Sequence, residues 1–144
     1  MKERKGDTSD RGQRGFTLIE LLMVMVILGL LAAVVGPNIF RQAVSARIKT
    51  TKLQIAEIVQ ALDHLALDTG RYPSDGEGLG ALMTQPSDME QWDGPYMKRL
   101  PKDAWNHEFI YHLGGGRDAS SPYVVISGGA DGREGGGDDI SSAE

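Results

Sequence analysis

Cysteine is absent from this chain of 144 residues. Its absence excludes disulfide bridges, thiolate metal sites and a cysteine nucleophile. It does not identify the cellular compartment, because an exported protein can also lack disulfides. A surplus of basic residues is missing too, because 15 Lys and Arg stand against 20 Asp and Glu. This balance argues against nucleic acid as a partner, since phosphate binding needs excess positive charge. The length allows a single domain.

Residues 1–15 contain no apolar residue after Met1, but they contain five basic and three acidic residues. Such a segment cannot bury surface, and we expect it to be disordered or removed. Without residues 1–15 the chain keeps 10 basic and 17 acidic residues, which gives a formal charge of −7.

A long apolar run follows from Phe16 to Phe40 and contains one charged residue, Glu20. A helix needs about 20 apolar residues to cross a bilayer core of roughly 30 Å, so this run predicts a membrane span. The basic segment before it predicts a cytoplasmic N-terminus. A cleaved secretory signal is the alternative, because Ala32-Ala33 and Gly36 weakly resemble a small-residue cleavage site.

Glu20 is the unusual residue of this run. A carboxylate in a lipid-exposed helix costs on the order of 2.5–3.5 kcal/mol at the helix centre and less toward the interface. One explanation is that Glu20 lies four residues into the run and reaches the headgroups by snorkelling. The other is that a second chain supplies a cation.

The segment Arg14-Gly15-Phe16-Thr17-Leu18-Ile19-Glu20 resembles the class III signal of type IV pilins and type II secretion pseudopilins. The resemblance implies that a prepilin peptidase cuts between Gly15 and Phe16 and methylates the new N-terminus. It also implies that the amine of Phe16 in one subunit pairs with Glu20 of a neighbour. A buried charge of this kind would set the register of assembly.

One helix is predicted from Thr17 to about Leu67, with Thr69-Gly70 as its C-terminal cap. Gly36-Pro37 predicts a kink or a melted turn, because Pro removes a backbone donor and clashes with the preceding turn. Beyond this break the helix is predicted to be amphipathic. Its apolar stripe comprises Val44, Ile48, Ile55, Val59, Leu62 and Ala66, while His64 is expected to be a half-buried or surface residue.

Residues 71–106 predict ordered loops with a short helix at 78–83, because they are rich in Pro, Gly and Asp. The aromatic residues in these loops are expected to pack onto the scaffold rather than to bind a ligand. Segments 108–113 and 122–127 predict an antiparallel pair of strands, joined by a Gly-rich loop at 114–121.

The sequence offers two places for a metal ion. His107 and His112 do not form a zinc motif, because a separation of five residues in a strand points them to opposite faces. The Gly-rich tail from Ser127 to Ile140 is more favourable, since it contains Asp131, Asp138 and Asp139. Carboxylates and backbone carbonyls are the ligands of hard cations. A solvated acidic tail remains the alternative from composition alone.

Further segments resemble the major pseudopilin of type II secretion, the general secretion pathway protein G family. They are GRYPSDGEGLGALM (70–83), WDGPYMKRLPKDAW (92–105) and GADG (129–132). The resemblance implies calcium bound by Asp131, Asp138, Asp139 and the carbonyl of Gly128. The approach to this loop departs from the family pattern, because Gly128 stands where Leu is common.

The predicted elements and the resemblance together imply an α+β, type IV pilin-like fold: a long N-terminal helix, hydrophobic in its first half, on a small antiparallel sheet with long ordered loops. The predicted parts are a cleaved leader (1–15), a transmembrane and filament-core helix (16–40) and a periplasmic head with a calcium loop (41–144). The function implied by the resemblance is that of a non-enzymatic subunit of the secretion pseudopilus in the inner membrane.

The implied partners are further copies of the chain, minor pseudopilins, an inner-membrane assembly platform, prepilin peptidase and membrane lipid. A polymer growing from the inner membrane would drive folded proteins through an outer-membrane channel. Three alternatives stay open at this point: a minor pseudopilin, a type IV pilin, against which the missing cysteines count, and a signal-anchored calcium-binding domain.

Overall fold

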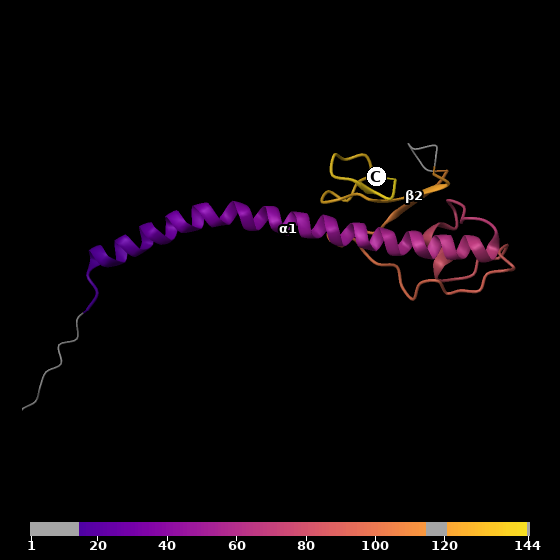
Figure 1. Cartoon of the computed structure of the whole chain (residues 1–144), viewed down its shortest axis with the longest axis horizontal. Helices are drawn as coiled ribbons and strands as arrows, with labels where there is room; N and C mark the ends of the chain where they lie inside the picture. Colours follow the sequence, from indigo (N-terminus) through magenta and orange to yellow (C-terminus); the bar gives the residue numbers. More distant parts are fainter. Residues whose placement is uncertain (1–14, 115–120, 144) are drawn as a thin grey trace, which may run out of the picture. The chain divides into compact units, whose positions relative to one another are not determined.

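One long helix and a small sheet make up the protein (Figure 1). The computed structural model describes residues 15–114 and 121–143. The elements in chain order are α1 (Leu18–Thr69), the 3₁₀ helix η1 (Gly78–Leu82), β1 (Ile110–Leu113), β2 (Tyr123–Ser127) and β3 (Ile140–Ser141). The predicted α+β, pilin-like fold is confirmed. The leader up to Arg14 and the central part of the 114–121 loop lie outside the described residues.

The chain divides into two compact units, one ending at Arg41 and the other beginning at Gln42. In the first unit every side chain from Gly15 to Val35 is exposed, and Leu18 keeps 84% of its surface. This stretch has no protein partner of its own among the described residues. It belongs to a helix long and apolar enough to cross a membrane, as the sequence predicted.

The predicted melted turn at Gly36-Pro37 is not present, because α1 is helical without interruption from Leu18 to Thr69. A proline inside a helix removes one backbone hydrogen bond, and the bonds on either side can hold the turn together. The C-terminus of α1 agrees with the prediction. Gly70 adopts a φ of +76°, its N–H donates to the carbonyl of Ala66, and the Thr69 hydroxyl donates to the carbonyl of Leu65.

The core of the second unit lies along one face of α1. The fully buried apolar side chains of this helix are Ile58, Leu62 and Leu65. The predicted stripe was wrong at Val44, which is 53% exposed. Ile48 is partly buried against the core, and the first fully buried residue of the helix is Thr51, whose hydroxyl accepts a hydrogen bond from the amide of Ala104. His64 is exposed, as expected.

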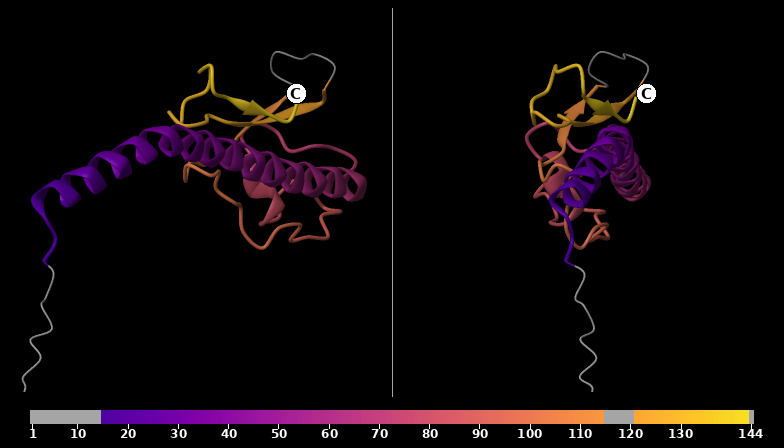
Figure 2. Two further views of the ribbon diagram at one scale, coloured as in Figure 1. Left: turned by 60° about the vertical axis from the view of Figure 1, so that its left-hand side comes forward. Right: turned by 90° about the vertical axis from the view of Figure 1, so that its left-hand side faces the viewer.

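The sheet is antiparallel with the order β1-β2-β3. Tyr111 pairs with Val125, and Ser127 pairs with Ile140. The two longer strands were predicted, but β3 was not. It is held by a further exchange with Ser142, which donates its amide to the carbonyl of Val125 and accepts the Val125 amide on its hydroxyl. Figures 1 and 2 show the sheet on one side of this half of α1 and most of segment 71–106 on the other.

The loop aromatics pack against this core, as predicted. The Trp92 indole N–H donates to the carbonyl of Ala81 at 2.8 Å, and the Tyr96 ring meets the Trp92 ring edge-on. Tyr96 also donates its hydroxyl to Asp68 on α1 at 2.7 Å. These contacts attach an irregular segment to the helix without regular secondary structure.

Candidate functional site

The first candidate site is the start of α1. The Glu20 carboxylate accepts hydrogen bonds from the backbone N–H of Thr17 at 2.9 Å and from its hydroxyl at 3.1 Å. The Glu20 amide in turn donates to the Thr17 hydroxyl at 3.3 Å. This reciprocal pattern is a capping box, in which Thr and Glu three residues apart satisfy otherwise free N–H groups at a helix start. Glu20 therefore caps the start of the apolar helix and also places a negative charge there.

The box lies immediately after Gly15 and Phe16, the predicted cleavage residues. Phe16 is 83% exposed, and no basic side chain forms an ion pair with Glu20 within the described ranges. A chain cut before Phe16 would carry its new amine one residue from Thr17 and four from Glu20. The structure thus presents the carboxylate at the surface of the unit, where a group from another molecule can reach it.

The second candidate site is the tail between β2 and β3. Its two ends are adjacent, because Ser127 and Ile140 pair directly in the sheet. The Gly132 amide donates to the carbonyl of Gly128 at 3.0 Å and closes a tight turn. Gly129 and Gly132 have φ values of +60° and +70°, which favour glycine. A side chain at Gly129 would collide with Asp138. These glycines let the acidic residues approach the turn.

The carboxylates of Asp131 and Asp138 meet beside Gly136. A Cβ atom built on Gly136 would lie 2.8 Å from Asp138 Oδ1 and 3.3 Å from Asp131 Oδ2. Asp138 Oδ2 accepts the amide of Ala130 at 2.6 Å, which holds this carboxylate over the turn. No ion pair to either carboxylate occurs in the part of the chain that the structure describes. Two adjacent like charges are stabilised by a cation between them.

Asp139 is placed differently. Its Oδ2 accepts the amide of Gly135 at 2.7 Å, while its Oδ1 is buried without a hydrogen-bond partner. Within residues 15–114 and 121–143, no three acidic or histidine side chains are grouped as a metal site. The structure therefore brings together Asp131 and Asp138 but not Asp139, and the Gly128 carbonyl is engaged in the turn. The all-oxygen donor set still suits calcium, and the unpartnered oxygen of Asp139 is available as a further donor.

A buried network anchors this tail to the core, and the sequence analysis missed it. Asp103 accepts the Ser127 hydroxyl on Oδ2 at 2.6 Å, and its Oδ1 accepts the amides of Trp105 and His107. His107 Nδ1 lies 3.1 Å from the carbonyl of Gly129. Asp103 thus connects the loop beside α1 with the first residues of the acidic turn. No local sequence signal predicts a contact between residues 24 positions apart.

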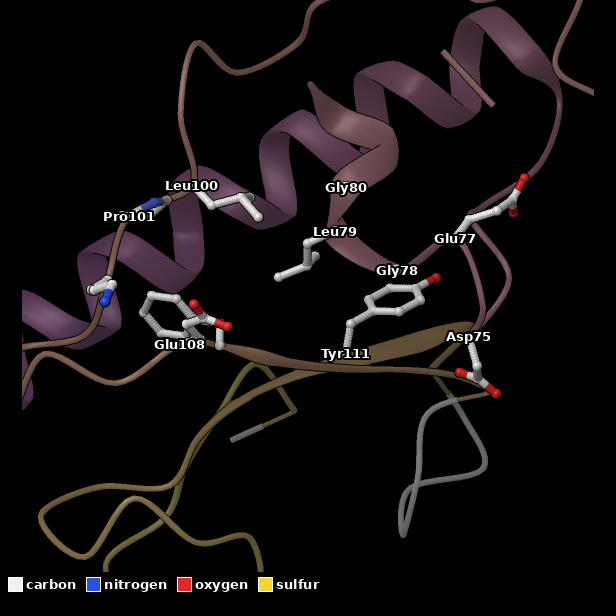
Figure 3. A pocket seen from close by; sticks show the side chains of 11 residues that line it. Asp75, Glu77, Gly78, Leu79, Gly80, Leu100, Pro101, Glu108 and Tyr111 are labelled. Carbon is white, nitrogen blue, oxygen red and sulfur yellow. The ribbon is translucent and has the colours of Figure 1, made fainter. Parts of the chain in front are cut away.

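A cavity of about 400 Å³ lies between η1, β1 and the segment around Leu100 (Figure 3). Leu79 and Leu100 point into it, and the Tyr111 ring lies below them. Two of its three carboxylates serve the fold, because Asp75 accepts the amide of Leu113 and Glu77 binds Arg71. The cavity is therefore lined by apolar side chains together with three carboxylates and Lys102.

Glu77 forms a bidentate ion pair with Arg71. Arg71 donates to both Glu77 oxygens at 2.8 Å, and Ser74 donates its amide and its hydroxyl to Oε2. Ser74 and Glu77 repeat the capping-box pattern of Thr17 and Glu20. The hydrogen bonds from Arg71, with those from Ser74, hold the pKa of Glu77 well below its ordinary value.

We expect Glu77→Gln to lower the free energy of unfolding by about 1.5–3 kcal/mol at pH 7, the range for hydrogen bonds to a charged group. Because the folded pKa is depressed, this stabilisation is present above the ordinary carboxyl pKa and is lost as the pH falls below it. The difference between wild type and variant should therefore shrink from pH 5 to pH 3 in urea titrations. The exposed Glu108→Gln is the control, and an equal pH dependence of both variants would contradict this role.

The sequence profile described as type II secretion system (T2SS), protein G matches residues 38–143. The chain belongs to this family. A second profile, described as the prokaryotic N-terminal methylation motif, matches residues 10–36 and so includes Gly15, Phe16 and Glu20. The two profiles adjoin at Pro37, inside the apolar run of α1.

Similar proteins agree with this family. A type II secretion system core protein G from Pseudomonas aeruginosa is 43% identical over 133 residues, which cover 89% of this chain and 91% of that protein. A core protein G from Vibrio cholerae is 38% identical and covers 90% and 91%. The crystal structure of the major pseudopilin of enterohaemorrhagic Escherichia coli matches with a TM-score of 0.63 at 28% identity, covering 74% of this chain and 94% of that one.

Membership in the protein G family decides among the alternatives that the sequence left open. The chain is a major pseudopilin, a structural component of type II secretion. The match to the methylation motif agrees with a processed N-terminus at the start of α1. Calcium at the tail stays a prediction.

Proposed function

We propose that prepilin peptidase cuts this chain between Gly15 and Phe16, and that the mature subunit polymerises from the inner membrane into the periplasm. The growing pseudopilus would drive folded proteins through an outer-membrane channel. Further copies, minor pseudopilins and an inner-membrane assembly platform are the proposed partners. The head from residue 41 onward would lie in the periplasm.

The observation that carries this proposal is an apolar helix that has no partner among residues 15–114 and 121–143 of its own chain. The large side chains between Phe16 and Val35 are all at least half exposed. Exposed apolar patches of this extent mark contact with lipid or protein. Lipid and a filament core are both apolar, so moving the helix from one to the other changes hydrophobic burial little. The Glu20 carboxylate would then give the assembled state its specific contact.

The proposal is tested on filaments sheared from cells that produce the chain together with its secretion system. Mass spectrometry of the filament subunit should find a chain that begins at a methylated Phe16. A subunit that keeps residues 1–15, or a mature chain that never leaves the membrane fraction, would contradict the proposal. Because the chain has no cysteine, engineered cysteines can report subunit contacts by disulfide cross-linking without competing thiols from this chain.

We further propose that the tail binds calcium. Asp131 and Asp138, which meet beside Gly136, would be the first ligands. Asp139 would add its unpartnered oxygen, and the carbonyl of Gly128 would complete the predicted set after a small rearrangement of the turn. The ion would neutralise two adjacent carboxylates and join the residues after β2 to those before β3.

Calcium should raise the thermal stability of the mature chain in detergent micelles. A ligand at 1,000 times its dissociation constant adds about 4.1 kcal/mol, and each kcal/mol moves the midpoint of a domain of this size by roughly 4–8 °C. We therefore expect calcium to raise the unfolding midpoint by about 15 °C or more, in a thermal melt monitored by tryptophan fluorescence. Asp131→Asn should abolish the rise, while Glu134→Gln, which removes a charge from the same loop, should keep it. Equal shifts with magnesium would contradict a calcium site.

A further inference from the structure

The half of α1 that follows the apolar run has an unusual charge distribution. Between Glu20 and Glu57 the sequence contains no acidic residue, but it contains four basic ones. We call Arg47, Lys49 and Lys52 the basic collar. All three are exposed, and none forms an ion pair within the residues described. Arg41 precedes them and donates to Asn38 in its own helix.

The position of the collar along the helix follows from residue spacing. The stretch without charge runs from Leu21 to Phe40 and has 20 residues. At 1.5 Å per residue this is about 30 Å, the thickness of a bilayer hydrocarbon core. Glu20 then lies at one interface and Arg41 at the other. The collar follows Phe40 by about 10–18 Å along the helix, within reach of the headgroup region and its field.

The directions of the three cations favour lipid over a protein surface. At 100° per residue, Lys52 and Lys49 lie about 140° and 200° around the helix from Arg47. A protein that docks on one side would select a stripe, whereas headgroups surround a membrane helix on every side. Helical Cα–Cβ bonds also tilt toward the N-terminus, so these long side chains lean toward the membrane.

We propose that the basic collar binds the phosphates of anionic phospholipids at the outer surface of the inner membrane. This inference rests on the proposed membrane insertion of the subunit. Cations near a membrane surface are attracted by anionic lipid, and the attraction weakens within a Debye length. The collar would fix the depth at which the unassembled subunit lies in the bilayer. Extraction into the filament would have to break these contacts, so anionic lipid would slow assembly.

The test measures which lipid surrounds the full mature chain. The chain is reconstituted in phosphatidylcholine bilayers with trace spin-labelled phosphatidylglycerol or phosphatidylcholine, and the immobilised fraction of each is compared by electron paramagnetic resonance. Arg47→Gln/Lys49→Gln/Lys52→Gln should reduce the preference for phosphatidylglycerol by about threefold or more at low salt. Arg47→Lys/Lys49→Arg/Lys52→Arg keeps the charges and should keep the preference. In 1 M salt, where the Debye length is about 3 Å, wild type and neutral variant should converge.

Three outcomes would overturn the proposed role of the collar in lipid binding. Equal preference in wild type and neutral variant, with both inserted, removes it while leaving the proposed function intact. The same result together with weaker self-association of the neutral variant would assign these cations to the acidic surface of a second copy. A wild-type chain that alkaline carbonate extracts from the bilayer would overturn membrane insertion, and the collar with it.

Discussion

Glu20→Gln is expected to remove this chain from filaments while leaving it in the membrane. The amide keeps an oxygen that can accept the Thr17 hydrogen bonds but loses the charge that a neighbouring Phe16 amine would meet. Leaving one partner of a buried ion pair uncompensated costs about 3–5 kcal/mol, so incorporation should fall at least a hundredfold. Insertion should be equal or better, because the helix no longer carries a carboxylate into lipid. Sheared filament, normalised to subunit in the membrane fraction, is the measurement.

Thr17→Ala separates charge pairing from capping. This variant keeps the Glu20 carboxylate but loses the capping hydroxyl, which costs about 1 kcal/mol of local helix stability. If the carboxylate acts between subunits, Thr17→Ala still assembles and Glu20→Gln does not. If Glu20 serves only the helix start, Thr17→Ala is the more damaging change and Glu20→Gln assembles. That second pattern would refute the assembly role.

Asp103→Ala is expected to give the largest loss of stability in the head. The side chain is fully buried, and its removal leaves the Ser127 hydroxyl and the amides of Trp105 and His107 without their acceptor. Each buried group left unpaired costs about 1–3 kcal/mol, so a total of about 4 kcal/mol or more is expected. Chemical denaturation of the mature chain in detergent, followed by tryptophan fluorescence, measures this loss.

Asp103→Asn provides the graded comparison. Its amide oxygen can still accept from the two backbone amides, and its NH₂ group can donate to the Ser127 hydroxyl oxygen, so the expected loss is only about 1–2 kcal/mol. The exposed Glu108→Gln should change the stability by less than about 0.5 kcal/mol. Equal small effects for Asp103→Ala and Glu108→Gln would show that the network carries no stability.

Local patterns in the sequence predicted the elements that have local causes. The end of α1 at Gly70 and the two longer strands have clear residue preferences, and the structure confirmed them. The capping box at Thr17 and Glu20 was also readable, since Thr-x-x-Glu before an apolar run is its signature. It was missed because the charge of Glu20 was considered without its hydrogen-bonding partner.

The remaining features depend on contacts between distant residues. β3 has only two residues, too few to show an alternating pattern, and it forms because β2 offers a partner. Full burial along α1 begins at Thr51 rather than Val44, because the loop that contains Ala104 reaches the helix there. The meeting of Asp131 and Asp138 depends on glycine turns whose course no periodicity specifies.

The edge strands of the sheet have a consequence for the association of neighbouring subunits. An unpaired strand margin can template pairing with another molecule and start aggregation. Here the Asp75 carboxylate occupies the amide of Leu113 on the free side of β1, and β3 on the other side is only two residues long. Within the described residues, neither edge strand offers a long row of free amides and carbonyls. Pairing of heads strand to strand is thereby disfavoured, and the exposed apolar helix is free to direct ordered association.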